Sequence, residues 1–151
     1  MISVVVPVRD EEHTVAELHE QLAAALEGRG DPWEVVFVDD GSRDGTHAAL
    51  VGLHDRSDKV KVVRLRRNAG KAAALDAGFR EAEGDVVVTI DGDLQDDPAE
   101  IPRLLAKLDE GYDLVSGWKT KRLDPLSRRL PSRVFNRVTA SLSGLRLHDL
   151  N

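Results

Sequence analysis

The feature that most constrains the fold is a series of short Val- and Ile-rich runs that alternate with segments of helical periodicity. The runs cover residues 2–6, 34–38, 60–65, 85–90 and 113–116. Between the first two, apolar residues recur at helical spacing, at Val15, Leu18, Leu22 and Leu26. Runs without polar alternation are typical of parallel strands that are covered on both faces. The sequence therefore predicts an α/β fold, a mostly parallel sheet flanked by helices.

Size and composition exclude several classes of protein. A chain of 151 residues is long enough for one soluble domain with its own core. It has no cysteine, which excludes thiolate zinc sites, iron–sulfur clusters and a cysteine nucleophile. The apolar runs are much shorter than the ~20 residues of a membrane-spanning helix. Dinucleotide-binding, zinc-hydrolase and serine-hydrolase functions have no support, because G-x-G-x-x-G, H-E-x-x-H and G-x-S-x-G do not occur.

The formal charge of −6 conceals an uneven distribution of charged residues. Residues 1–118 carry 13 Lys and Arg against 25 Asp and Glu, whereas residues 119–151 carry 8 against 2. We therefore expect an acidic body and a basic C-terminal segment. The segment has the pattern of a basic amphipathic helix, with an apolar stripe of Leu130, Val134, Val138, Leu142 and Leu145. Such a helix either packs on the sheet or meets phosphates, nucleic acid or an anionic membrane surface.

Two adjacent acids end the second run, in the sequence VDDGSRDGT of residues 38–46. In a parallel sheet with helices on both faces, ligands bind beyond the carboxyl ends of the strands. Asp44 can cap a helix that starts near Thr46, but capping does not account for Asp39 and Asp40. Their like charges repel each other unless they meet hydrogen-bond donors, so we expect them to bind ribose hydroxyls or a base N–H.

The loops after the first and third runs are less specific. The first, PVRDEE, ends a strand and opens a helix with acids. In the third, Lys71 follows Gly70, but the earlier glycine and the following Ser or Thr of a P-loop are missing. A basic loop at a helix start can face a diphosphate, and an ordinary helix entry explains it equally well.

The strongest local signal is TIDGDLQDDP, residues 89–98, directly after the fourth run. On an extended backbone Asp91 and Asp93 project to the same side, and Gly92 lets the chain bend between them. Two carboxylates suit a hard cation, Mg²⁺ or Mn²⁺, whose other ligands are water and the oxygens of a substrate diphosphate. The sequence therefore predicts a metal site at Asp91 and Asp93.

Taken together and in order, five motifs resemble the family 2 glycosyltransferases with a GT-A fold: PVRDEE, VDDGSRDGT, NAGKAAAL, DGDLQDDP, and FN followed by LHDLN. The resemblance covers essentially the whole chain. It is greatest to the branch of dolichol-phosphate mannose synthases and bacterial polyprenol-phosphate glycosyltransferases. It implies inverting, metal-dependent transfer of a sugar from a nucleotide diphosphate sugar to a polyprenyl phosphate. It also implies a place on the cytoplasmic side of the membrane, peripheral or anchored by segments absent from this chain, and no nucleic-acid partner.

The resemblance also implies roles for individual residues. By position in the motifs, Asp91 and Asp93 would hold the metal on the diphosphate, and Asp93 would thereby act in catalysis. Asp149 falls where the family has an acid near the reacting centre, and Arg129 and Arg133 would lie towards the acceptor. Asp10 stands where Asn is more usual. The nucleotide pocket would be formed by Pro7, Asp10, Glu11, Asp39, Asp40, Lys71 and Asp91.

The nature of the acceptor decides whether the reaction needs a base. An alcohol acceptor requires a carboxylate to remove its proton. A phosphate acceptor has a second pKa near ~6 and is mostly ionised at neutral pH. Asp149 would accordingly act as a base or orient the acceptor or the metal.

In the family the pattern continues beyond Asn151 with Cys-Gly and further helices that often span the membrane. We therefore expect a part of a longer enzyme and do not expect activity from this piece alone. The alternatives are a glycosyltransferase with a non-lipid acceptor, a sugar nucleotidyltransferase, and a non-catalytic module that binds nucleotide sugars or membranes. A nucleotidyltransferase should carry a basic, Gly-rich loop early in the chain, and PVRDEE has the opposite charge.

Overall fold

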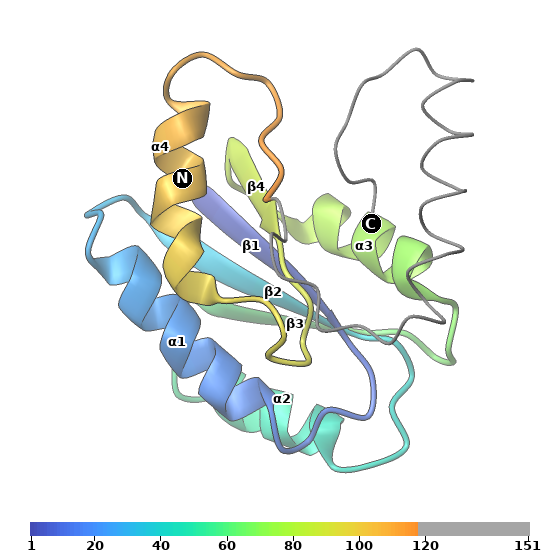
Figure 1. Ribbon diagram of the computed structural model, residues 1–151. Helices are drawn as coiled ribbons and strands as arrows, with labels where there is room; N and C mark the ends of the chain where they lie inside the picture. The colour runs from blue at the N-terminus through green and yellow to red at the C-terminus, as the bar shows by residue number, and fades with distance from the viewer. Residues whose placement is uncertain (118–151) are drawn as a thin grey trace, which may run out of the picture.

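A computed structural model describes residues 1–117 as a parallel sheet with helices on both faces (Figure 1). The strand order is β3-β2-β1-β4, and all three pairings are parallel. The predicted α/β class with a mostly parallel sheet is confirmed. The strands are β1 (Ile2–Val8), β2 (Trp33–Asp39), β3 (Val60–Arg64) and β4 (Val86–Thr89).

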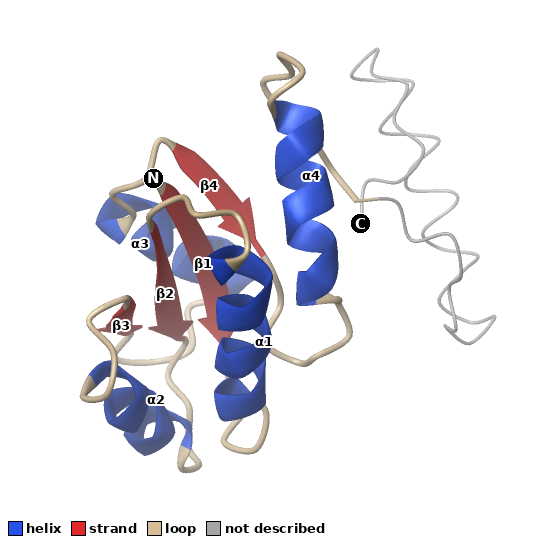
Figure 2. Ribbon diagram, turned by 90° about the vertical axis from the view of Figure 1, so that its left-hand side faces the viewer, coloured by secondary structure: helices blue, strands red, loops and turns tan. Residues whose placement is uncertain are grey.

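Three helices cover one face of the sheet and one covers the other, as the turned view in Figure 2 shows. The first group is α1 (Val15–Glu27), α2 (Thr46–His54) and α4 (Ile101–Leu108), with the short 3₁₀ turn η1 (Pro98–Glu100) before α4. The opposite face carries α3 (Lys71–Glu81). The predicted first helix is confirmed, since α1 buries the four residues whose spacing indicated it.

The central strands divide their side chains between two apolar layers. Phe37 and its alternate neighbours in β2 pack under α1 and α2, whereas Val36 and Val38 pack against Ala74 of α3. Every residue of β2 is buried. Each large apolar side chain buried in this way contributes about 1.5–3 kcal/mol to folding. Burial on both faces is the reason that these runs show no polar alternation.

Two expectations about the edge of the sheet are wrong. Residues 113–116 form no strand: the run has only two apolar residues, Leu114 is 82% exposed, and no strand of residues 1–117 pairs with it. β4 is not covered on both faces. Val87 pairs with Ser3, on the side of the sheet where α3 lies, and it is 43% exposed because α3 lies over β1 and β2 instead.

The basic segment 119–151, with Arg129, Arg133 and Asp149, lies outside the described residues. Within the described part, none of the helices combines the length and hydropathy that crossing a bilayer would take.

A buried cluster of polar side chains connects the loop before β4 to the amino-terminal end of the sheet through hydrogen bonds and ion pairs. Glu34 is 5% exposed and accepts hydrogen bonds from Ser3 Oγ (2.6 Å) and the Glu83 N–H (2.8 Å). Lys61 Nζ lies 2.7 Å from both Glu34 Oε2 and Glu83 Oε1. Burial by itself raises the pKa of Glu34, but the hydrogen bonds from Lys61, Ser3 and the Glu83 N–H outweigh it and lower the pKa below its ordinary 4.5.

We expect Glu34→Gln to lower the free energy of unfolding by about 1–3 kcal/mol at pH 7, because an amide cannot pair with Lys61. A carboxylate whose pKa is lowered by folding stabilises the protein fully at pH values above its ordinary, unfolded pKa. That contribution is lost as the pH falls through the lower folded value. Urea unfolding should therefore show a smaller difference in the free energy of unfolding between the variant and the wild type at pH 3.5 than at pH 7.

The matched control is Glu83→Gln, because the Glu83 side chain is 71% exposed. It should change the free energy of unfolding by less than about 0.5 kcal/mol. Equal losses in the two variants at pH 7 would contradict the assignment of the stabilising charge to Glu34.

Candidate active site

A cavity of about 440 Å³ opens at the carboxyl edge of the sheet, between the ends of β1 and β4. The chain passes from β1 outward to β2 and β3, then returns across the sheet to β4 on the other side of β1. Open α/β sheets bind ligands where the strand order reverses in this way. The volume lies in the range of small-molecule sites.

The cavity brings together six of the residues that the sequence singled out, although they are up to 86 positions apart. Asp10 and Asp39 are not among the lining residues. The six come from the end of β1 and the loop after it, the first residue after β2, the start of α3 and the loop after β4, and they are Pro7, Glu11, Asp40, Lys71, Asp91 and Asp93.

The sequence reasoning missed two polar lining residues, Arg9 and Asn68. Arg9 directly follows β1, and Asn68 lies in the loop between β3 and α3. Both follow the ends of strands. The rule that ligands bind beyond the carboxyl ends of parallel strands, which pointed to the acids, could have found these two residues as well.

Asp39 is fully buried at the end of β2, beside the cavity. Its Oδ1 accepts the Ser42 N–H at 2.8 Å. Its Oδ2 has no hydrogen-bond partner among residues 1–117 and lies 3.5 Å from Arg64 Nε and 3.7 Å from His47 Nδ1. The nearby Arg64 guanidinium thus opposes the negative charge, while one oxygen stays available for a further donor.

Asp40 anchors the loop that leads into α3. Its two carboxylate oxygens accept the backbone N–H groups of Ala69 (2.7 Å) and Gly70 (3.0 Å). The adjacent acids therefore avoid mutual repulsion by finding donors within the protein, a role that the sequence alone did not indicate. Asp40 also lines the cavity, so it shapes the wall at the point where α3 begins.

Asp10 joins the loop after β1 to the loop after β2. It has a positive φ of 55°, its Oδ1 accepts the Arg43 N–H at 2.7 Å, and its own N–H donates to Ser42 Oγ at 3.0 Å. Asp and Asn tolerate this left-handed conformation better than most residues, which gives a backbone reason for an Asp at a position where the family more often has Asn. Asp44 is expected to cap α2; the N-cap residue is Gly45, and Asp44, one residue before it, accepts the N–H of Thr46, the first residue of the helix.

Gly92 and Asp93 lie in a turn, so the backbone is not extended through both acids as expected, yet Asp91 and Asp93 both line the cavity. Gly92 serves close packing: a Cβ at this position would lie 2.6 Å from Val8 Cγ1. Asp93 Oδ1 accepts the Gln95 N–H at 3.1 Å. Asp91 instead meets an ammonium group, with Lys71 Nζ 2.6 Å from Oδ1 and 2.9 Å from Oδ2.

The chemistry of these donors fits a hard divalent cation. Asp91 and Asp93 offer only carboxylate oxygens, the ligands that Mg²⁺ and Mn²⁺ prefer. In residues 1–117 no group of three or more His, Cys, Asp or Glu side chains is placed to hold a metal ion. A cation held by two acids has to complete its shell with water and ligand oxygens, which a cavity open to a diphosphate can supply.

The family can be assigned from sequence comparison. The model of glycosyl transferase family 2 matches residues 3–147. The chain belongs to glycosyl transferase family 2. An undecaprenyl-phosphate 4-deoxy-4-formamido-L-arabinose transferase from Pseudomonas paraeruginosa (strain DSM 24068 / PA7) is 42% identical over 150 residues. The match covers 99% of this chain and 44% of that protein, so this family 2 chain spans less than half of the curated relative's length.

Solved structures confirm the predicted GT-A fold, because the neighbours of this family 2 chain are GT-A glycosyltransferases. Glucosyl-3-phosphoglycerate synthase from Mycobacterium tuberculosis, in complex with UDP, has a TM-score of 0.71 at 26% identity. The match covers 95% of this chain and 50% of that one. Mannosyltransferase PcManGT from Pyrobaculum calidifontis, in complex with GDP-Man and Mn²⁺, has a TM-score of 0.55 at 31% identity over 61% of this chain and 27% of that one.

Gly41 lies where the loop after β2 packs closely against the loop before α3. Its φ is +69°, and a Cβ here would lie 2.6 Å from the backbone carbon of Arg67 and the backbone nitrogen of Asn68. We expect Gly41→Ala to lower the free energy of unfolding by about 2–4 kcal/mol, measured by urea unfolding, because strain and a backbone clash act together. Gly52→Ala is the control: Gly52 lies inside α2 with open space around it, so alanine should stabilise by up to about 1 kcal/mol. A Gly41→Ala variant as stable as the wild type would contradict the close loop approach.

Proposed function

We propose that this chain forms the nucleotide-sugar-binding part of an inverting, metal-dependent glycosyltransferase that transfers a sugar from a nucleotide diphosphate sugar to a polyprenyl phosphate. The observation that carries the proposal is the cavity at the strand-order reversal, which Asp91 and Asp93 line together with Lys71, the first residue of α3, in a family 2 chain. The Pseudomonas relative is named for an undecaprenyl-phosphate acceptor. The two structural neighbours hold UDP, or GDP-Man with Mn²⁺.

The walls of the cavity provide matching groups for each part of the donor. Pro7, Glu11 and Asp40 form the side that we assign to the nucleoside, where carboxylates accept hydrogen bonds from ribose hydroxyls or a base N–H. Asp10 and Asp39 support that side from behind, by holding the loops after β1 and β2. The start of α3 faces the diphosphate, because the first N–H groups of a helix have no partners within the helix and favour an anion.

Asp91 and Asp93 would hold the Mg²⁺ or Mn²⁺ ion. When bound, this cation neutralises the charge that develops on the departing nucleoside diphosphate. The two acids fix the position of the diphosphate relative to the acceptor, which is the contribution of the D-x-D loop to catalysis. Inversion follows from a single in-line displacement at the sugar carbon. Asp149 remains our candidate for orienting the acceptor or acting as a base.

The acceptor and location belong to the same proposal. Arg129 and Arg133 of the basic segment would bind the lipid phosphate at the cytoplasmic side of an anionic membrane. A small soluble acceptor is the second candidate, since the glucosyl-3-phosphoglycerate synthase neighbour is named for a phosphorylated one. The two candidates can be distinguished by measuring the release of nucleoside diphosphate by a longer form of the protein. We expect polyprenyl phosphate to stimulate this release, whereas stimulation by phosphoglycerate alone would favour the second candidate.

We expect Asp93→Ala to abolish the metal-dependent part of donor binding and to leave the fold intact. The reason is that Asp93 is one of the two acids that we assign to the cation and is exposed at the cavity. Calorimetry with UDP-sugars and GDP-sugars, with and without Mn²⁺, measures the effect. Asp85→Ala is the matched control, because it removes the same charge at the other end of β4, where the Asp85 side chain is 92% exposed. Unchanged affinity of Asp93→Ala for the donor with Mn²⁺ would show that the metal site is elsewhere.

The basic segment gives a separate prediction about the membrane. The chain should bind anionic liposomes at low salt and release them as salt screens the charges. Replacing Arg129 and Arg133 by glutamate should abolish liposome binding, and acceptor use in a longer active form, while donor binding stays unchanged. The same reversal at Arg80 and Arg103, two exposed arginines of the body, should leave liposome binding within about twofold. If the Arg129 and Arg133 variant retains full acceptor use, the lipid-phosphate assignment is wrong.

A further inference from the structure

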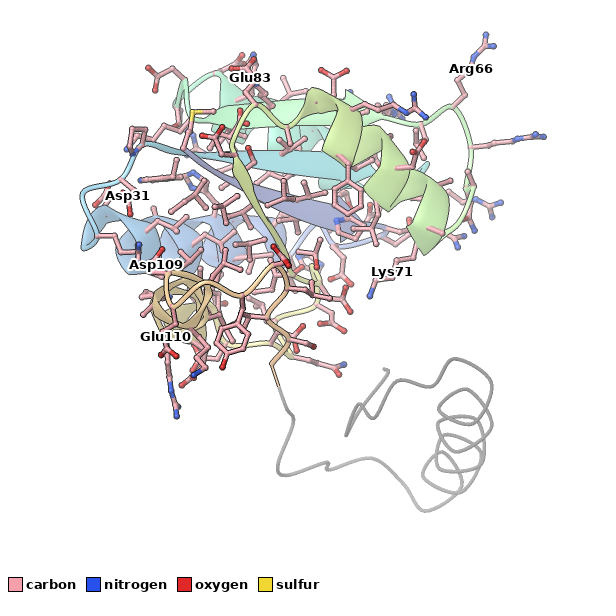
Figure 3. The ribbon with its side chains drawn as sticks, turned by 90° about the horizontal axis from the view of Figure 1, so that it is seen from above. Asp31, Arg66, Lys71, Glu83, Asp109 and Glu110 are labelled. Carbon is pink, nitrogen blue, oxygen red and sulfur yellow. The ribbon has the colours of Figure 1, made fainter. Side chains whose placement is uncertain are left out.

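Lys71 is bound to one of the two acids that we assign to the cation. Its ammonium lies 2.6 Å from Asp91 Oδ1 and 2.9 Å from Asp91 Oδ2, so it faces both oxygens of the carboxylate. The two residues come from opposite walls of the cavity, the start of α3 and the loop after β4. Figure 3 shows Lys71 at this end of α3, whereas Arg66, in the loop before the helix, points away into solvent.

A lysine and a divalent cation compete for the same oxygens in this arrangement. The ammonium occupies the lone pairs of Asp91 that a metal ion would need, and its positive charge would lie within a few ångströms of the ion. The pair is also easy to break, because the Lys71 and Asp91 side chains are 61% and 42% exposed. Lys71 therefore excludes a lone cation only weakly, and a cation that arrives together with an anion can displace it.

The diphosphate provides an alternative partner for the displaced lysine. Lys71 is the first residue of α3, at the helix end that favours an anion. Its long side chain can turn from the carboxylate to a phosphate oxygen without any movement of the helix. The neighbouring N–H groups of Ala69 and Gly70 are already held by Asp40, so the ammonium is the mobile donor at this wall.

We propose that Lys71 is a positioning residue that occupies the Asp91 carboxylate until a divalent cation and a nucleoside diphosphate bind together, and that it then moves to the diphosphate. This inference rests on the proposed function and adds a linkage to it. The diphosphate offers Lys71 another partner and so frees Asp91 for the cation, and the cation releases Lys71 to the diphosphate. The cation and the nucleotide therefore bind cooperatively. In the state without ligands, Lys71 replaces part of the cation's charge and keeps Asp91 in place.

The test is to measure Mn²⁺ binding to the full 151-residue chain in the absence of nucleotide, comparing the wild type with Lys71→Met. The variant should bind Mn²⁺ about fivefold more tightly, because no ammonium competes for Asp91. In the presence of Mn²⁺, it should bind the nucleoside diphosphate about tenfold more weakly, because the diphosphate loses a charged donor. The nucleotide is UDP or GDP, whichever the wild type binds more tightly. Lys71→Arg should restore most of the nucleotide affinity.

Arg66→Met is the matched control, since it removes one positive charge from the same loop but outside the cavity. It should change both affinities by less than about twofold. If Lys71→Met leaves Mn²⁺ affinity unchanged, or leaves nucleotide affinity unchanged, the role of Lys71 is overturned while the proposed function stands. If the wild type binds neither UDP nor GDP with Mn²⁺, the proposed function itself fails.

Discussion

The site depends on the burial of β1 and β2 on both faces. Strands that are apolar on both sides require helices on both sides, and right-handed connections between parallel strands then bring each strand-to-helix loop to the same edge. In this chain the strand order reverses between β1 and β4, because α3 carries the chain back across the opposite face of the sheet from α1 and α4. A cavity forms there, and the loops after β1 and β4 become its walls. The apolar layers thus determine where polar chemistry can occur.

The acids of the motifs serve folding and binding at once. Asp40 holds the start of α3, Asp10 joins two loops, and Asp44 binds the first N–H of α2, each by accepting backbone N–H groups. These bonds fix the loop backbones that carry the residues of the cavity, and hydrogen bonds to a charged acceptor contribute more than neutral ones. An acid in such a motif cannot be assigned to ligand binding from its position alone, because the backbone of a tight loop needs acceptors as much as a nucleotide does.

The sequence predicted the helices and strands that show a periodic apolar pattern. It did not predict features that depend on contacts between residues far apart in the chain. Val15, Leu18 and Leu22 predicted α1, and the buried runs predicted the first four strands, because these patterns are local consequences of burial. The run 113–116 looked similar but finds no pairing partner in the described sheet. Asp91 and Lys71 meet because α3 packs against β1, and no local sequence pattern predicts that packing. The ion pair between them was therefore missed, although both residues had been singled out.

The charges of the cavity provide a physical reason for linking the cation to the nucleotide. Four acids line the cavity, Glu11, Asp40, Asp91 and Asp93, against two bases, Arg9 and Lys71, so its formal charge is negative. A nucleotide diphosphate sugar carries a negative charge on each phosphate, and the field of the acids opposes its entry. A divalent cation removes that opposition, but a cation alone must compete with Lys71 for Asp91. Entering together, the two ligands neutralise the acids and release a lysine to the phosphates, so the obstacle that each ligand meets alone is removed when both bind.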